Sequence, residues 1–215
     1  MKILSVNVGL PRKVVFKGQE VETGIFKEAV QGRVNLRKLN LDGDRQADLT
    51  VHGGADKAVY AYPSEHYDYW KGQLPGTELP WGMFGENFTT EGLEEDSLNI
   101  GDQFKIGTAK AMVTQPRMPC YKLGVKFGRV DIVRRFLASG RSGFYFRVLQ
   151  EGDVGTGDAI ELISRDKKNL TVKDIVRLYV HDKDDIMTLK NASQHESLPE
   201  DWREYFRQQI AHLGK

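Results

Sequence analysis

The spacing of hydrophobic and polar positions divides the chain into a strand-rich part and a helical part. The segment KILSVNVGL, residues 2–10, places apolar side chains at every second position, as a half-buried strand does. Residues 32–41 form a second strand candidate that ends in an Asp-Gly turn signal. Residues 101–117 predict a hairpin that turns at Gly107, and residues 143–163 predict two more strands around a polar, glycine-rich turn.

Short helices interrupt the strand-rich part. Residues 64–74 and 129–140 show helical spacing, and Gly140 is in the position of a C-cap. Many short strands with glycine-rich turns favour a β-barrel or sandwich, whereas a parallel α/β sheet would need regular helical crossovers. We therefore predict a mainly β barrel with short helices over residues 1–165.

The last quarter of the chain has a helical pattern throughout. A helix is predicted from a Thr171 cap, a second over residues 184–194 and a third over residues 201–213. The third follows Ser-Leu-Pro-Glu at residues 197–200, a capping-box pattern with proline in the first turn. We predict a small C-terminal three-helix domain over residues 166–215.

Length, charge and cysteine content limit the possible functions. A chain of 215 residues can bury roughly 70% of the surface that its unfolded state exposes, so it needs no disulfide or structural metal. The net charge of +1 gives no reason to expect nucleic acid or an anionic membrane as a partner. The N-terminal stretch is too short and polar for a signal peptide, and no apolar run approaches ~20 residues. With a single cysteine, the chain fits a reducing compartment, and we expect a cytoplasmic protein.

The single cysteine lies in a stiff, basic stretch, QPRMPC. Arg117 and Lys122 flank Cys120 in the sequence, and two prolines restrict the segment. Nearby cations lower the pKa of a thiol, and the thiolate is the form that binds metals or attacks electrophiles. A lone cysteine is more often a small buried hydrophobe, and the local sequence alone leaves both readings open.

A second polar cluster, residues 43–63, surrounds a Gly-Gly pair. It contains Arg45, His52 and Lys57, and two adjacent glycines let the backbone approach a ligand or form an anion-binding nest. His52 is placed either to donate a proton or to cap an element, and both roles stay open. The glycine-punctuated loop GMFGENF adds Asn87.

Several familiar chemistries are absent from the sequence. It contains no Walker or dinucleotide-binding glycine motif, no HxH or HExxH zinc motif and no GxSxG nucleophile elbow.

Taken together, the motifs resemble the MOSC-domain family, closest to its YiiM-like branch, which also has a C-terminal three-helix domain. Any one of them is weak evidence, but their ordered succession is specific. In chain order they are TGIFKEAV, GDRQADLTVHGG, KAVYAYPSEHYDYW, GMFGENFTTEGL, NIGD, QPRMPCYKLG, SGFYFRVLQEG and VGTGDAIEL.

The resemblance implies a β-barrel core that binds the molybdenum cofactor, molybdopterin, with Cys120 as the protein ligand to the metal. A soft thiolate suits a thiophilic metal that already carries a dithiolene. Because the pterin carries a phosphate, the resemblance also gives an anion-binding role to cations of the motifs. Pyridoxal phosphate is a further ligand associated with the superfamily. The implied cofactor-binding residues are Lys27, Arg45, His52, Lys57, Asn87, Arg117 and Cys120.

The resemblance further implies a reductase of N-hydroxylated compounds such as hydroxylaminopurine-type base analogues. The reaction would convert N–OH to N–H with loss of water, with Cys120 and His52 as catalytic residues and His52 as the proton donor. The chain has no flavin, haem or nicotinamide signature, so a separate electron-donating reductase is expected as a partner. A cofactor or sulfur carrier without turnover, a non-catalytic binding module and a homodimer all remain open.

Overall fold

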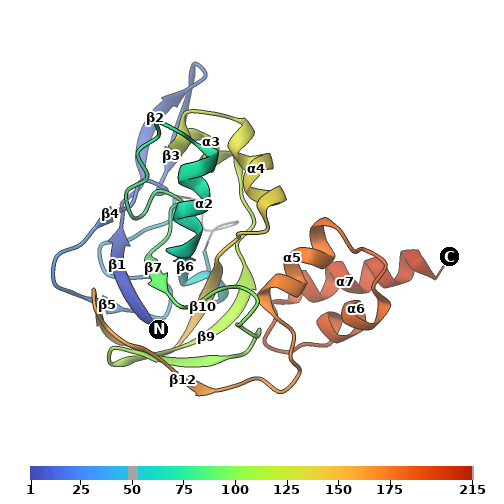
Figure 1. Cartoon of the computed structure of the whole chain (residues 1–215). Coiled ribbons are helices and arrows are strands. Elements are labelled where there is room, and N and C mark those ends of the chain that lie inside the picture. The colour runs from blue at the N-terminus through green and yellow to red at the C-terminus, as the bar shows by residue number, and fades with distance from the viewer. Residues whose placement is uncertain (48–52, 215) are drawn as a thin grey trace.

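The computed structural model describes residues 1–47 and 53–214 of the chain. Figure 1 shows a curved sheet with helices on its outer side and, beside it, a lobe of three helices that ends at the C-terminus. The strands are β1 (Lys2–Val8), β2 (Arg12–Phe16), β3 (Gln19–Thr23), β4 (Glu28–Ala29), β5 (Arg33–Leu36), β6 (Val59–Pro63), β7 (Phe88–Glu91), β8 (Gln103–Ile106), β9 (Ala109–Pro116), β10 (Phe144–Gln150), β11 (Gly152–Gly155) and β12 (Ile160–Ser164). The helices are η1 (Ala55–Lys57), α2 (Glu65–Gln73), α3 (Tyr121–Phe127), α4 (Asp131–Ser139), α5 (Val172–Val180), α6 (Ile186–Ser193) and α7 (Glu200–Leu213).

Eight strands form the main sheet, in the order β12-β8-β9-β10-β6-β7-β1-β4. All neighbouring pairs are antiparallel except β6 and β7. The prediction of a barrel is confirmed only in part. A single bridge, Lys2 with Ala159, links β1 to the residue just before β12, and no continuous ladder closes the sheet in the described ranges. The fold is thus a curved, mainly antiparallel sheet rather than a fully closed barrel.

Most predicted elements are present. The 101–117 hairpin is confirmed as β8 and β9, with Gly107 at positive φ between them. Gly140 ends α4 in the left-handed conformation, and Thr171 caps α5 through a capping box. The predicted cap of α7 is wrong, because the helix begins at Glu200 after Pro199 without a side-chain cap.

Two features between the predicted elements were missed. The turn cluster after β10 contains a further strand, β11, which pairs with β5. The helix α3 follows Cys120 directly, where the sequence indicated only a stiff loop.

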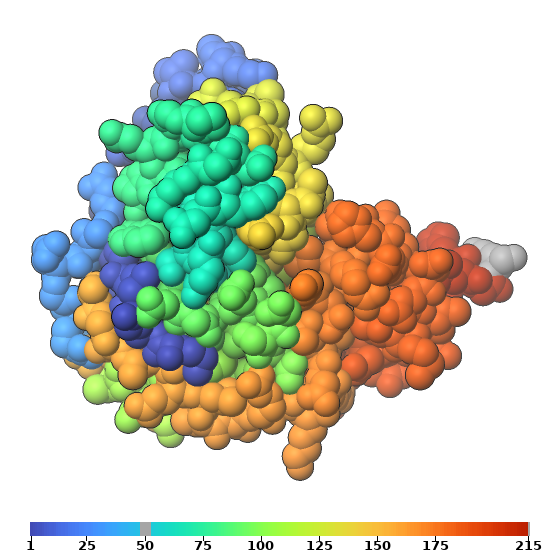
Figure 2. Space-filling model, viewed as in Figure 1, coloured from blue at the N-terminus to red at the C-terminus, as the bar shows by residue number. Residues whose placement is uncertain are grey.

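One hydrophobic cluster runs from the sheet into the C-terminal helices. It joins Phe104, Phe144 and Phe146 of the sheet to Leu189 of α6 and Phe206 of α7. Backbone bonds also cross the junction, from the Ile100 N–H to the Leu170 carbonyl and from the Val172 N–H to the Leu98 carbonyl. Figure 2 shows the three helices, orange to red, as a lobe in contact with the strand-rich part.

The predicted boundary at residues 165/166 falls in the connection between β12 and α5. Because the two parts share one core, their independence as domains stays a prediction.

A second, aromatic cluster packs α2, α3 and α4 onto the sheet. Tyr62, Trp70, Phe84 and Phe136 are fully buried in it. The Trp70 indole N–H donates to the Tyr62 hydroxyl over 2.7 Å, which satisfies the polar group of a buried tryptophan. This packing fixes the segment that leads from β9 into α3. Across residues 1–47 and 53–214, no helix has the length and apolar character needed to cross a bilayer.

Candidate functional site

A pocket of about 660 Å³, including space continuous with solvent, lies where the ends of several strands meet. Its wall is formed by residues 45–47, by the segments that follow β3 and β9, by the starts of β6 and β10, and by the residue before β7. Its lining residues are Thr23, Gly24, Ile25, Lys27, Arg45, Gln46, Ala47, Lys57, Tyr60, Gly85, Asn87, Arg117, Met118, Cys120, Lys122 and Tyr145.

The pocket brings together six of the seven residues predicted as a site. All six line its wall and come from several parts of the sequence; they are Lys27, Arg45, Lys57, Asn87, Arg117 and Cys120. His52, the seventh, lies outside the described residues, so its predicted role as a proton donor stays a prediction.

Cys120 occupies the junction between β9 and α3. Its backbone is extended, with φ −117° and ψ 173°, and its carbonyl accepts a hydrogen bond from the Leu123 N–H at 3.0 Å. The side chain is partly exposed and forms no capping bond to the helix. The thiol is therefore a pocket-lining group, and the alternative of a cysteine sealed in the core is wrong.

Arg117 is a buried cation with an unused hydrogen-bond donor. The residue is 5% exposed, and its Nη1 has no hydrogen-bond partner among the described residues. Its guanidinium lies 5.3 Å from the ring centroid of Tyr60 and 5.0 Å from that of Phe136. Aromatic faces stabilise a cation only in part, and a buried charge without a counterion costs several kcal/mol. The arrangement therefore favours an anion beside Arg117.

Lys27 belongs to a buried polar network at the other side of the pocket. Its ammonium forms an ion pair with Asp44, and burial lowers the pKa of Lys27 although the Asp44 carboxylate acts to raise it. Asp44 also accepts from the Gly9 N–H at 2.9 Å and from the Asn87 Nδ2 at 2.9 Å. Asp44 compensates much of the Lys27 charge, so Lys27 offers less to a ligand than Arg117 does.

Asn87 forms its side-chain hydrogen bonds with neighbouring protein groups. Its Nδ2 donates to Asp44 and to the Asn7 carbonyl, at 3.2 Å, while its Oδ1 accepts from the Tyr60 N–H at 3.1 Å. Both amide hydrogens are thereby used within the protein. Asn87 thus holds Asp44 and Tyr60 in place, and any contact with a ligand would come through its remaining acceptor capacity.

The glycine-punctuated loop is shaped by close approach to the pocket wall. Gly85 has φ 81°, and a Cβ there would lie 2.8 Å from the Cγ1 of Ile25. Inside the loop, the buried Glu86 accepts from the N–H groups of Gly82 and Phe84, and burial raises its pKa. Glu86 is therefore a structural carboxylate that holds the loop, and it does not line the pocket.

Two tyrosines and a lysine complete the pocket and were missed from the sequence. Burial raises the pKa of Tyr60 and of Tyr145, so both hydroxyls stay protonated at neutral pH. Tyr60 donates to the Ser142 carbonyl at 2.9 Å. Tyr145 alternates with Phe144 and Phe146 in β10, and this period of two is the signal that could have placed it on the pocket side. Lys122 follows Cys120 by two residues and lies on the same wall.

The charge of the pocket is strongly one-sided. Five of the residues that line the pocket are lysine or arginine, and no lining residue is aspartate or glutamate. In the ranges that the structure describes, no three or more His, Cys, Asp or Glu side chains cluster in a way that could hold a metal ion. The arrangement suits an anionic ligand, and it suits a metal only if the metal brings most of its ligands with it.

The other described histidines do not line the pocket. His66 is buried and lies 2.7 Å from Glu95, and His195 is buried and lies 3.2 Å from Asp166. His212 is exposed.

The family models identify the class of this protein. A model of the MOSC domain matches residues 48–161, and a model of the YiiM-like three-α-helix domain matches residues 170–213. The chain belongs to the MOSC-domain family, in its YiiM-like branch.

Relatives and solved structures agree with this placement. The chain is 42% identical to the uncharacterized protein YflK of Bacillus subtilis, covering 95% of this chain and 92% of that one. It is 40% identical to protein YiiM of Escherichia coli over 74% of this chain and 71% of that one. The crystal structure of YiiM from Geobacillus stearothermophilus superposes with a TM-score of 0.82 at 37% identity, covering 97% and 98% of the two chains.

A more distant relative is named for an activity. A Gibberella moniliformis protein named "Reductase" is 31% identical over 82% of this chain, which corresponds to 32% of the fungal protein.

Proposed function

We propose that this chain is a molybdenum-cofactor-dependent reductase of N-hydroxylated compounds, with the Cys120 thiolate as the protein ligand of the metal. Membership of the MOSC family and the fungal relative's name support a reductase. The observation that carries the proposal is the pocket itself. It places one thiol beside five cations, and the buried Arg117 among them has an unused donor.

The described residues fit such a cofactor. A molybdenum ion held by a dithiolene needs few protein ligands, and one soft thiolate suits it. The phosphate of the pterin would lie against Arg117, with Lys57, Lys122 and Arg45 around it, because these cations line the same pocket.

When bound, the cofactor supplies the two-electron chemistry that converts N–OH to N–H with loss of water, and a separate reductase supplies the electrons. The protein contributes position and charge. Tyr145 presents a protonated hydroxyl on the same wall as Cys120, where it can donate a hydrogen bond to the substrate's oxygen. Arg117 and its neighbouring cations would bind the anionic end of the ligand.

Metal analysis tests the proposal directly. Wild type, Cys120→Ala and the control Tyr121→Phe would be purified from a host that makes the cofactor, and molybdenum per chain would be measured by mass spectrometry. Tyr121 adjoins Cys120 but is 59% exposed and does not line the pocket, so its hydroxyl should not matter. We expect Cys120→Ala to lose at least four-fifths of the metal, whereas Tyr121→Phe keeps it. Equal molybdenum in wild type and Cys120→Ala would overturn the assignment.

Turnover separates the reductase from a carrier. The loaded wild-type chain should reduce a hydroxylaminopurine to the aminopurine with a reduced viologen as electron donor. A chain that retains molybdenum but leaves the substrate unchanged would be a carrier.

A further inference from the structure

The short helix η1 connects a pocket cation to the rest of the fold. Lys57, its last residue, lines the pocket. The preceding residue, Asp56, is held from several sides. Its carbonyl accepts from the Thr114 hydroxyl at 2.7 Å and from the Gln115 Nε2 at 3.3 Å, and its carboxylate accepts from the Arg147 Nε at 2.6 Å. The backbone from which Lys57 projects is thus fixed through its neighbour.

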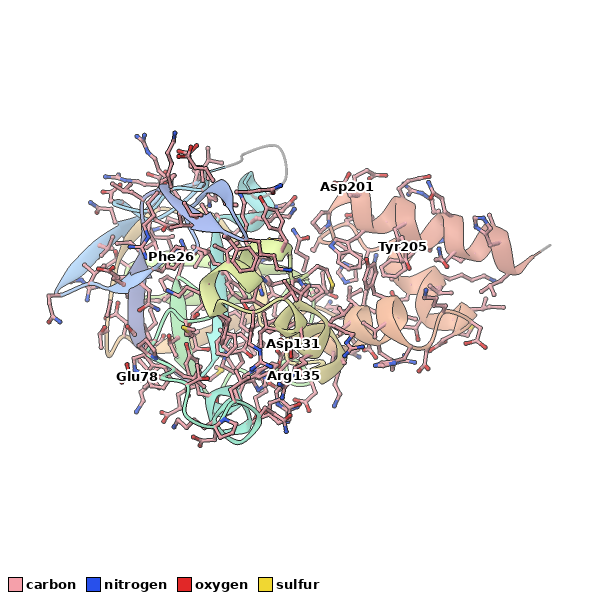
Figure 3. The ribbon with its side chains drawn as sticks, turned by 90° about the horizontal axis from the view of Figure 1, so that it is seen from above. Phe26, Glu78, Asp131, Arg135, Asp201 and Tyr205 are labelled. Atoms are coloured by element: carbon pink, nitrogen blue, oxygen red, sulfur yellow. The ribbon has the colours of Figure 1, made fainter. Side chains whose placement is uncertain are left out.

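A side chain of α7 connects the C-terminal helices to Asp56 by way of Gln115. The Trp202 Nε1 of α7 donates to the Oε1 of Gln115 at 2.8 Å, and Gln115 is buried in β9. The two ends of the Gln115 amide therefore join α7 to η1. Trp202 itself is stacked on Phe206, with ring centroids 5.7 Å apart, and it also contacts Tyr205. Figure 3 shows Tyr205 inside the helical lobe and Asp201 at the start of α7, on the side that faces the sheet.

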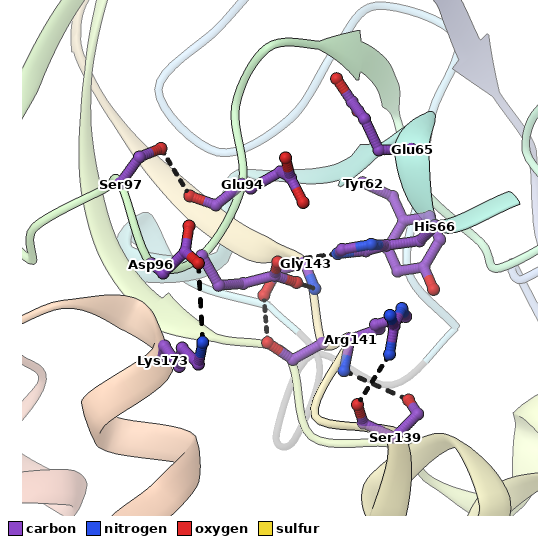
Figure 4. A network of polar contacts seen from close by, with 12 residues as sticks. Tyr62, Glu65, His66, Glu94, Asp96, Ser97, Ser139, Arg141, Gly143 and Lys173 are labelled. Atoms are coloured by element: carbon purple, nitrogen blue, oxygen red, sulfur yellow. Dashed lines mark hydrogen bonds and ion pairs between the residues drawn. The ribbon is translucent and has the colours of Figure 1, made fainter. Parts of the chain in front are cut away.

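A separate route joins α5 to Arg117. The Lys173 N–H donates to the Glu95 carbonyl at 3.0 Å, and the Glu95 carboxylate accepts from the Gly143 N–H at 2.6 Å. The Gly143 carbonyl in turn accepts from the Arg117 N–H at 3.3 Å. Figure 4 shows the surroundings of Gly143, with Lys173, whose ammonium pairs with Asp96, on one side and His66 on the other. Val176 of α5 also lines a small cavity beside Arg117.

We propose that the C-terminal helices position Lys57 and Arg117 for a phosphate-type dianion, and that Trp202 is the positioning residue for Lys57. This inference rests on the proposed function, because it concerns the same pocket. Asp56, the neighbour of Lys57, is two hydrogen bonds away from α7, and the Arg117 backbone is three hydrogen bonds away from α5. Neither helix contributes a residue to the pocket lining. A dianion that is bound by two cations from different segments gains from such preorganisation, because less freedom is lost on binding.

Binding of inorganic phosphate to the purified full chain tests this role without the cofactor. Isothermal titration calorimetry would compare wild type, Trp202→Phe, Lys57→Ala, the double variant and the control Tyr205→Phe. Trp202→Phe keeps an aromatic ring in the cluster and removes the bond to Gln115, whereas Tyr205→Phe alters the same aromatic cluster without touching Gln115. We expect Trp202→Phe to weaken phosphate binding about fivefold, the factor that corresponds to one lost hydrogen bond.

The double variant shows whether Trp202 acts through Lys57. In a Lys57→Ala background, Trp202→Phe should have no further effect on the dissociation constant, because its target is gone. The same fivefold loss in both backgrounds would overturn the route. If Trp202→Phe does not fold, Gln115→Met removes the connection from the sheet side and should give the same loss.

The outcomes separate the two proposals. Unchanged phosphate binding in Trp202→Phe and Gln115→Met, with lowered melting temperatures, would reduce the contact to packing and overturn the positioning role alone. No phosphate binding by the wild-type chain would overturn the anion pocket itself, and with it both proposals.

Discussion

One arginine in the strand-rich part and one in the C-terminal helices differ in how their charge is compensated. In the helices, Arg177 contacts three carboxylates, with its guanidinium 2.8 Å from Asp182 and 2.9 Å from Asp185, and these hydrogen bonds raise its pKa. In the strand-rich part, Arg117 is more deeply buried, yet it forms no ion pair with a carboxylate of the described residues. Its neighbours include the rings of Tyr60 and Phe136.

The difference shows which cations are available to a ligand. Partly exposed ion pairs on a helix each contribute about 0–1 kcal/mol, and their charge is already neutralised within the protein. A buried guanidinium without a counterion destabilises the fold by several kcal/mol, so its retention is better explained by binding than by folding. The same reasoning ranks the pocket cations, because Lys27 has Asp44 as its counterion and Arg117 has none in the described ranges.

The largest expected effect concerns the hydrophobic core that the two parts share. Phe206 is fully buried in α7, within the cluster that also contains the sheet residues Phe104 and Phe146. Phe206→Ala should lower the free energy of unfolding by about 3–5 kcal/mol. Because the core is continuous, urea unfolding followed by circular dichroism should remain a single transition that shifts as a whole. A separate early transition, with the sheet unaffected, would show that the helices fold independently.

The second expected effect compares the two arginines directly. Arg117→Met should weaken the binding of inorganic phosphate at least tenfold, because a charge-assisted hydrogen bond contributes about 1.5–3 kcal/mol. Arg177→Met removes a cation of the other kind and serves as the matched control, with phosphate affinity unchanged. Calorimetric titration of both variants measures the contrast.

Stability should follow the opposite order. Arg177→Met should lose up to about 1 kcal/mol, whereas Arg117→Met should leave the fold as stable or make it more stable. Equal losses of phosphate affinity in both variants would remove the distinction between paired and unpaired cations.

The sequence predicted the elements well where periodicity was clear. The hairpin of β8 and β9 and the helix after Thr171 follow from alternating or helical spacing with a recognisable turn or cap. The helix α3 was missed because Pro116 and Pro119 suggested a stiff loop, although proline restricts only the residues before the helix and not the helix itself. Closure of the sheet was over-predicted, since strand number and alternation do not fix how the edges meet.

The candidate site was predicted through family resemblance more than through local pattern. Lys27, Lys57 and Cys120 are far apart in the sequence, so their meeting in one pocket depends on topology. Local sequence gave no sign that Lys27 would be buried against Asp44, or that a hydrogen bond from Trp202 would reach β9. Such contacts join residues between 17 and 87 positions apart, which no short-range periodicity encodes.

The smallest expected effect is a loss of folding stability at acidic pH that arises in the helical part. His195 is 1% exposed, and its Nδ1 has no partner among the residues described. Burial lowers its pKa, and Lys168 acts in the same direction, whereas Asp166 and Glu196 act to raise it. The unfolded chain therefore binds a proton more readily than the folded one. The stability linked to His195 is fully present above the unfolded pKa of 6.5 and is lost as the pH falls below it.

Urea unfolding at pH 7.5 and 5.5 measures this loss. His195→Gln, which cannot be protonated, should show a smaller difference between the two pH values than the wild type does. His212→Gln is the matched control, because His212 lies exposed on α7 and its replacement should leave the difference unchanged. The same difference in wild type and His195→Gln would mean that acid acts on other groups. The carboxylates of the strand-rich part, Asp44 first because it neutralises Lys27, would then be the next to replace.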